Sequence, residues 1–195
     1  MQFSDLDLNK TYSYADYLQW TFEERLELIK GKIFKMTPAP ASRHQSVSWI
    51  IASEFYNYLK GKPCKAYPAP FDVRLPRKGE QEDKNIYTVV QPDICVVCDP
   101  AKIDKRGCTG APDIVVEILS PGNNQKELRN KYDVYEESGV LEYWIVSPQD
   151  KTFLKYTLSA EGLYQPSKLM TIGDKIETSI LPGFALDLEI IFEGN

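Results

Sequence analysis

The run of six residues from Ile114 to Leu119, IVVEIL, most constrains what this chain can fold into. Five of the six are apolar, and turn-forming stretches flank the run, which is typical of a strand covered on both faces. Such strands occur in sheets flanked by helices, so the run predicts an α/β fold. The exception, Glu117, raises a question, because a buried carboxylate is stable only beside a cation or strong hydrogen-bond donors.

Periodic patterns predict the other elements. Apolar residues at helical spacing predict helices over 13–30, 42–60 and 124–138, and Thr21 with Glu24 fits a capping box in the first of them. Apolar or alternating runs predict strands at 32–36, 71–75, 87–97, 112–119 and 142–148, and strand-like pieces in a tail at 151–193 that ends in FALDLEIIF. We therefore expect a mixed sheet flanked by helices, with a β-rich C-terminal extension.

Length and charge restrict the class of protein. The 195 residues predict a single domain over 1–195, with a core at about 13–148 and the tail at 151–193. No apolar run approaches the roughly 20 residues needed to cross a bilayer, and the polar start is unlike a signal peptide, so we expect a cytoplasmic protein without membrane segments. The net charge of −5 counts against a broad nucleic-acid surface but allows a local basic groove or phosphate-neutralising metal ions.

The C-x-x-C formed by Cys95 and Cys98 suggests zinc or redox chemistry at first sight. It lies in the strand-like run QPDICVVC, where a separation of three places the two thiols on opposite faces. No second C-x-x-C or C/H pair follows. The pattern therefore favours ordinary core cysteines over a zinc site.

The residues that could carry chemistry are carboxylates and one lysine. Asp93 opens the apolar half of one predicted strand, and Glu117 lies within the next. On neighbouring strands the two carboxylates would converge on one spot, and Mg²⁺ takes one or two carboxylates while keeping sites for water and phosphate. Lys131 borders the inward face of the following helix. With His44 as the only histidine, catalytic schemes that need two are excluded.

These stretches resemble those of a known family. LELIKGKIFKMTPAPASRHQ, VVQPDICVV, GAPDIVVEILSPGN, LRNKYDVYEESGVLEYWIVSP and LPGFALDL are similar to the motifs of the Uma-two family, the restriction endonuclease domain within the PD-(D/E)XK nuclease superfamily. The resemblance implies a nuclease fold and metal-dependent hydrolysis of DNA.

Carried onto this chain, the resemblance gives Asp93 and Glu117 a metal-binding role, shared with Glu27, and gives Lys131 the role of the catalytic lysine. It gives Glu27 and His44 accessory catalytic roles. The implied cofactor is Mg²⁺, with Mn²⁺ as a substitute. The chain departs from the superfamily pattern because no lysine stands two residues after Glu117; the lysine is on the next helix.

Simpler explanations exist for the same residues. Asp93 fits a turn at a strand start, Glu27 an exposed acid, and His44 a solvated side chain. Glu127 and Lys131 have the spacing of a surface ion pair, which leaves the role of Glu127 open. Two further acids receive no catalytic role. Asp113 is interpreted as structural, and Glu142 is expected on the rim of the core.

Two functional hypotheses remain open. The first is a metal-dependent endonuclease acting on DNA, and the alternative is a non-catalytic nucleic-acid-binding or partner-binding module with the same fold. Because cutting both strands of a duplex calls for two centres, we expect a homodimer, with the tail or the hairpin at 71–90 in its interface.

Overall fold

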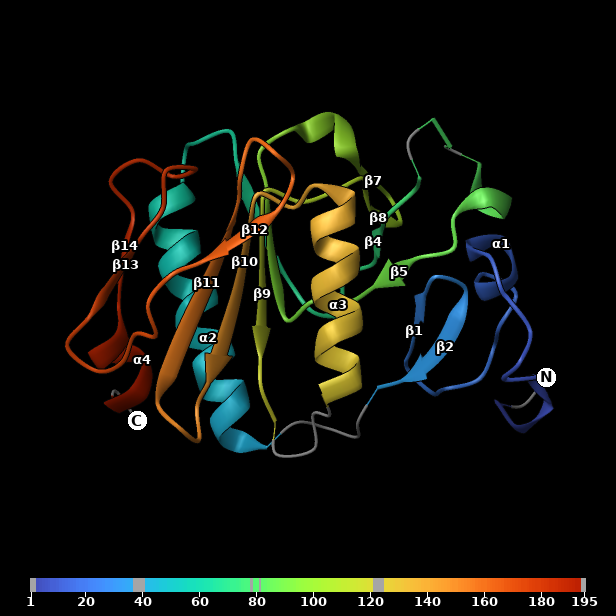
Figure 1. Ribbon diagram of the computed structural model, residues 1–195, viewed down its shortest axis with the longest axis horizontal. Helices are drawn as coiled ribbons and strands as arrows, with labels where there is room; N and C mark the ends of the chain where they lie inside the picture. The colour runs from blue at the N-terminus through green and yellow to red at the C-terminus, as the bar shows by residue number, and fades with distance from the viewer. Residues whose placement is uncertain (1–2, 37–40, 78, 81, 121–124, 194–195) are drawn as a thin grey trace.

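The structure is a computed structural model that describes residues 3–36, 41–77, 79–80, 82–120 and 125–193, without the side chains of 125–127. It contains two six-stranded sheets and a two-stranded ribbon, with helices packed around them (Figure 1). The expected mixed α/β fold flanked by helices is confirmed, although two sheets share the strands that were expected in one. No helix in the described part of the chain is long and apolar enough to cross a membrane.

One sheet holds the strand with Glu117 and is mixed. Strands β9 and β10 are parallel, and every other neighbouring pair is antiparallel. The helix α3 makes the crossover between β9 and β10, which is how parallel neighbours are joined. In order across the sheet, the strands are β12 (Tyr164–Pro166), β11 (Thr152–Leu158), β10 (Glu142–Ser147), β9 (Ile114–Ile118), β6 (Ile94–Val97) and β3 (Lys65–Pro68).

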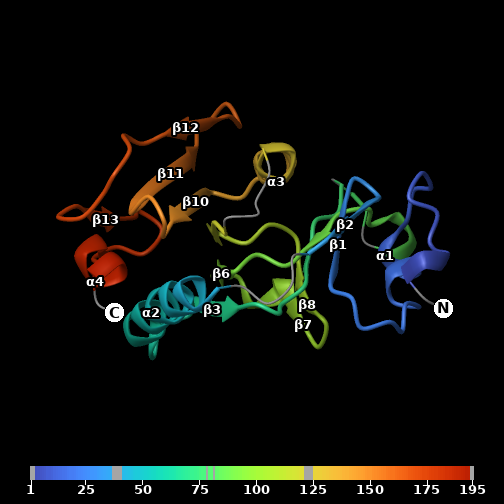
Figure 2. The ribbon, with the colours of Figure 1, turned by 90° about the horizontal axis from the view of Figure 1, so that it is seen from below.

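Two helices cover opposite faces of this sheet, α2 (Ser42–Leu59) and α3 (Gln125–Ser138) (Figure 2). The two faces follow the alternation of the strands. Val116 and Ile118 pack in the same apolar cluster as α2, whereas Val115 packs in the cluster that contains Tyr135 of α3. Glu117 shares the parity of Val115, so its side chain belongs to the α3 face.

The second sheet contains residues that were expected to be helical, so the prediction of a helix over 13–30 is wrong. The helix expected over 13–30 is only one turn, α1 (Tyr14–Tyr17), and residues 26–29 form strand β1. Lys30 (φ 52°) and Gly31 (φ 77°) join β1 to β2. A two-residue turn with positive φ at both positions is typical of a tight hairpin, so Gly31 turns a hairpin and does not cap a helix. The strands in order are β2 (Lys32–Lys35), β1 (Leu26–Ile29), β5 (Val89–Val90), β4 (Val73–Arg74), β8 (Gly107–Thr109) and β7 (Ile103–Asp104).

Two further local predictions are wrong. The capping box forms between Ser13 and Asp16 of α1, and not at Thr21 and Glu24, because the helix that the latter would begin does not exist. The run 87–97 is not one strand. It is interrupted at Gln91 and Pro92, so β5 and β6 belong to different sheets and the chain passes from one sheet to the other at this point.

The tail adds β11 and β12 to the mixed sheet and then forms the ribbon of β13 (Lys175–Glu177) and β14 (Ala185–Asp187). Its last segment, expected to be a strand, becomes helix α4 (Leu188–Glu193) after three residues, because Leu188, Ile191 and Phe192 bury one helical face in the core. The described residues also form three short 3-10 helices, at Phe3–Asp5, Asp83–Asn85 and Pro100–Lys102.

Glu142, expected on the rim, is 1% exposed. It accepts hydrogen bonds from Trp144 Nε1 (2.8 Å) and from Thr178 Oγ1 of the tail (2.9 Å), so the tail covers it. This acid is satisfied without a ligand.

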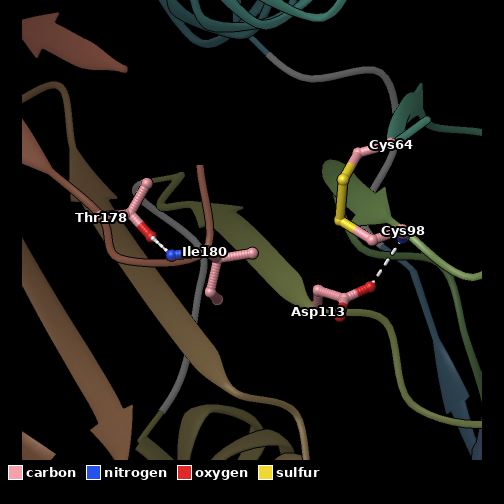
Figure 3. The surroundings of a disulfide bond; sticks show 5 residues. All are labelled: Cys64, Cys98, Asp113, Thr178 and Ile180. Atoms are coloured by element: carbon pink, nitrogen blue, oxygen red, sulfur yellow. Dashed lines mark hydrogen bonds between the residues drawn. A yellow bond between two sulfur atoms is a disulfide. The ribbon is translucent and has the colours of Figure 1, made fainter. Parts of the chain in front are cut away.

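A disulfide joins Cys64 to Cys98, one register step beyond the pair Lys65 and Val97 of β3 and β6 (Figure 3). The backbone N–H of Cys98 donates to Asp113 Oδ2 at 2.7 Å, which gives Asp113 a structural role. Cys95 is free and buried on the opposite face of the sheet from Cys98, as the strand alternation predicts, whereas Cys98 is a disulfide cysteine and not an ordinary core thiol.

Candidate active site

Glu117 lies in β9, and Asp93 immediately precedes the neighbouring antiparallel strand β6. The ladder pairs Ile94 with Val116, and continuing it by one residue sets Asp93 opposite Glu117. Asp93 Oδ2 accepts the backbone N–H of Ile118 at 2.7 Å, which holds this carboxylate beside β9. Asp93 therefore lies next to Glu117 at the end of β6, where His44 of α2 also contacts it.

Lys131 reaches Glu117 from helix α3. Its Nζ lies 3.0 Å from Oε1 and 3.1 Å from Oε2 of Glu117, and the lysine is 4% exposed. An amine this well buried stays charged only beside acids. Burial alone would lower the pKa of Lys131, but the charges of Glu117 and Glu27 outweigh it and hold that pKa well above its usual value.

Glu27 comes to the same place from the other sheet. Its Oε1 lies 3.2 Å from Lys131 Nζ and accepts the backbone N–H of Gln91 at 2.8 Å. Glu27 is 2% exposed, so the interpretation as an exposed acid does not hold. The interruption between β5 and β6 at Gln91 and Pro92 explains the contact. It leaves the backbone N–H of Gln91 outside the strand ladder, where it can donate to Glu27.

His44 approaches from the first turn of α2. Its Nε2 lies 3.3 Å from Asp93 Oδ2, and its buried Nδ1 has no hydrogen-bond partner among the described residues. Burial lowers the pKa of His44, but the hydrogen bond to Asp93 and its charge outweigh burial and raise that pKa above its usual value. His44 is therefore a buried partner of Asp93 and not a solvated side chain.

Tyr135 is a residue of the site that the sequence patterns did not single out. Its hydroxyl donates to Glu117 Oε1 at 2.7 Å, and the residue has no exposed surface. It stands four positions after Lys131, one helical turn further on the same face of α3. That spacing is the signal that could have found it.

Gln91 links the site to a second group of polar side chains. Its Oε1 accepts from Arg25 Nη2 at 2.6 Å, and its Nε2 donates to Asp72 Oδ1 at 2.8 Å. Burial raises the pKa of Asp72. No sequence pattern connected these three residues, because they come from distant segments that only the fold joins.

The buried carboxylate of Glu117 is thus met by a lysine and a tyrosine, but negative charge remains in excess. Burial raises the pKa of Glu117 to about 7; the charge of Lys131 lowers it, and those of Asp93 and Glu27 raise it further. Three carboxylates, those of Asp93, Glu117 and Glu27, share one lysine and the imidazole of His44, whose pKa is raised. This surplus is the environment that attracts a cation.

The donor set fits a hard divalent cation. Within the described part of the chain, no three His, Cys, Asp or Glu side chains form a ready metal-ligand group. Mg²⁺ does not need one, since it commonly takes one or two carboxylates and fills its other positions with water and phosphate. The contacts of Asp93 with described residues fall on Oδ2, which leaves Oδ1 available. The side chain of Glu127 lies outside the described residues.

Comparison with known proteins identifies the family to which the chain belongs. A protein of Synechocystis sp., described as "Uncharacterized protein slr1290", is 25% identical over 190 residues, which cover 93% of this chain and 92% of that protein. A crystal structure from Anabaena variabilis, described as a "putative nuclease belonging to DUF820", has the same fold, with a TM-score of 0.73, 19% identity and coverage of 93% of this chain and 97% of that one. The family Uma2, described as "Putative restriction endonuclease", matches residues 14–189. The chain therefore belongs to the Uma2 (Uma-two) family.

Proposed function

We propose that this protein is a metal-dependent endonuclease that hydrolyses phosphodiester bonds of DNA. The observation that supports it best is the buried cluster in which Lys131 bridges Glu117 and Glu27, with Asp93 next to Glu117 just before the neighbouring strand β6. A structural ion pair would balance its charges, whereas this cluster keeps an excess of carboxylate at a place that a divalent cation can fill. The nuclease description of the family supports the same reaction class.

In this proposal Asp93 and Glu117, assisted by Glu27, hold Mg²⁺, for which Mn²⁺ substitutes. An ion held there would supply Lewis-acid chemistry, which makes water a better nucleophile and stabilises negative charge on the phosphate. Lys131 pairs with Glu117 and Glu27 and directs its positive charge toward the attacking water or a phosphate oxygen. His44 holds the Asp93 carboxylate in place from α2.

Plasmid cleavage tests the proposal. Wild-type protein is incubated with supercoiled plasmid in Mg²⁺, in Mn²⁺ and in EDTA, and we expect nicked or linear product only with metal. Asp93→Asn and Glu117→Gln are expected to abolish cleavage. Asp133→Asn, the same change at an exposed position of α3, should cleave like wild type.

The outcome also separates the two hypotheses. Wild-type protein that shifts DNA in a gel but never cuts it, with either metal, would contradict the nuclease and support a binding module. Cleavage that survives EDTA or Asp93→Asn would contradict the metal centre proposed here.

The proposal includes a homodimer, because one centre cuts one strand and a two-fold axis supplies the second. The tail at 151–193 or the hairpin at 71–90 is the proposed contact. Light scattering at micromolar concentration should give about twice the chain mass of 22.3 kDa. A monomer mass together with purely nicked product would contradict this part of the proposal.

A further inference from the structure

We infer that Tyr135 is a positioning residue for Glu117: its hydroxyl occupies Oε1, so that Oε2 is the oxygen of Glu117 left to bind a cation. This inference rests on the proposed metal site. It concerns which oxygen of the acid is offered to the ion and what holds the acid in that orientation.

The contacts on the two oxygens are unequal. Among the described residues, Glu117 Oε1 is met by Tyr135 at 2.7 Å and by Lys131 at 3.0 Å, whereas Oε2 is met by Lys131 alone at 3.1 Å. Each carboxylate oxygen accepts about two hydrogen bonds. Oε1 is therefore filled and Oε2 keeps one position open.

Lys131 cannot set this orientation alone. Its ammonium is a compact charge on a flexible stem. The same Nζ also lies 3.2 Å from Glu27 Oε1. A carboxylate can turn beneath such a charge with little change in energy. The phenol of Tyr135 carries a single O–H on a rigid ring, so it favours one oxygen in one direction.

The ring that carries this hydroxyl is itself held firmly. Tyr135 is fully buried, and its ring centroid lies 5.0 Å from that of Tyr143 in an edge-on contact. The next residue of α3 ties the helix to the tail, because Glu136 accepts the backbone N–H of Tyr164 at 2.6 Å.

Tyr143 offers a matched control. It is as buried as Tyr135 and touches it, but its hydroxyl has no hydrogen-bond partner among the described residues. Tyr135→Phe and Tyr143→Phe therefore delete the same atom at neighbouring places in one cluster. Only the first deletion removes a contact with Glu117.

The experiment measures Mn²⁺ affinity by calorimetry or electron paramagnetic resonance, melting temperature in EDTA, and metal-free crystal structures of wild type and both variants. Loss of a hydrogen bond to a metal-ligating carboxylate commonly weakens metal binding roughly 10- to 100-fold. We expect that loss of affinity for Tyr135→Phe. We expect wild-type affinity for Tyr143→Phe, and a turned Glu117 carboxylate only in Tyr135→Phe.

Equal Mn²⁺ affinity in the two variants would overturn the inference, even if both melt at a lower temperature. So would a Glu117 carboxylate that does not move in Tyr135→Phe. Wild-type protein that binds no Mn²⁺ would refute the proposed function instead. In that case the metal-free structures still decide whether Tyr135 orients Glu117, since a turned carboxylate upholds that role and an unmoved one refutes it.

Discussion

Lys131 Nζ lies 3.2 Å from Glu27 Oε1, although the two residues are far apart in the chain. The contact joins α3, which covers the mixed sheet, to β1 of the second sheet. The same ammonium also binds Glu117 of β9. One buried cation therefore holds together acids that the chain supplies from separate elements.

Lys131→Met should destabilise the metal-free protein strongly. It leaves Glu27 and Glu117 buried without their cation, which typically costs about 3–5 kcal/mol of unfolding free energy. Urea denaturation in EDTA measures the loss. Lys30→Met is the control, because it removes an exposed pair with Glu137. Losing such a pair should cost under about 1 kcal/mol. Equal losses in the two variants would show that the buried network contributes nothing special.

Stability without metal should fall as pH rises through the titration of Glu117. Its pKa is raised to about 7, mainly by burial, from an ordinary value near 4.5. Between these values the folded state binds the proton more tightly than the unfolded state, so the unfolding free energy falls by about 1.4 kcal/mol per pH unit from this group. Glu117→Gln mimics the protonated acid and should lack this fall. Denaturation of both proteins in EDTA at pH 5, 6, 7 and 8 tests it; parallel curves would contradict it.

Gly31→Ala should destabilise the hairpin that carries Glu27. Gly31 has a φ of +77°, and an added Cβ would collide with the side chain of Thr11. Gly162 has the same φ but open space around it. Gly162→Ala therefore isolates the conformational cost of roughly 1 kcal/mol. We expect Gly31→Ala to lose about 1–3 kcal/mol more by overpacking. Thermal melting of the two variants gives the difference, and identical melting temperatures would be evidence against the collision.

Reducing the disulfide between Cys64 and Cys98 should lower the free energy of unfolding measurably. The disulfide of Cys64 and Cys98 joins residues 34 positions apart. Closing a loop of that length stabilises a protein by about 3–4 kcal/mol. Denaturation with and without dithiothreitol should show this loss in the wild type. The double variant Cys64→Ser and Cys98→Ser should be insensitive to the reductant. A wild type equally insensitive would indicate that the bond does not form in solution.

The parts of the fold that the sequence predicted are those in which one segment carries enough periodicity to be recognised alone. The helix at 42–60 and the strand around Glu117 are long, regular and bounded by turn residues, and both appear in the structure. Strand β1 has four residues, too few to outweigh the helical pattern before it. The hairpin signal at Lys30 and Gly31 was present but is equally typical of the end of a helix.

The sequence patterns pointed to individual residues of the candidate site, but they did not predict most of the contacts between them. Asp93 and Glu117 could be paired because their strands are close in sequence. The partners of Glu27 and Glu142 could not be predicted, since each acid is buried by a segment that arrives much later in the chain, Lys131 for the first and Thr178 for the second. Burial of this kind is a property of the assembled layers and has no local pattern.

The contact between Glu136 and Tyr164 ties the C-terminal tail to the helix that carries Lys131. Glu136 sits directly after Tyr135 on α3 and accepts the backbone N–H of Tyr164 in β12, while the Tyr164 hydroxyl donates to Val140 O just beyond the helix. A chain truncated after Asp150 would keep every carboxylate of the site. It would lose the brace that sets the depth of the helix bearing Lys131, and so the smallest unit that holds the site in this geometry is longer than the smallest unit that contains its carboxylates.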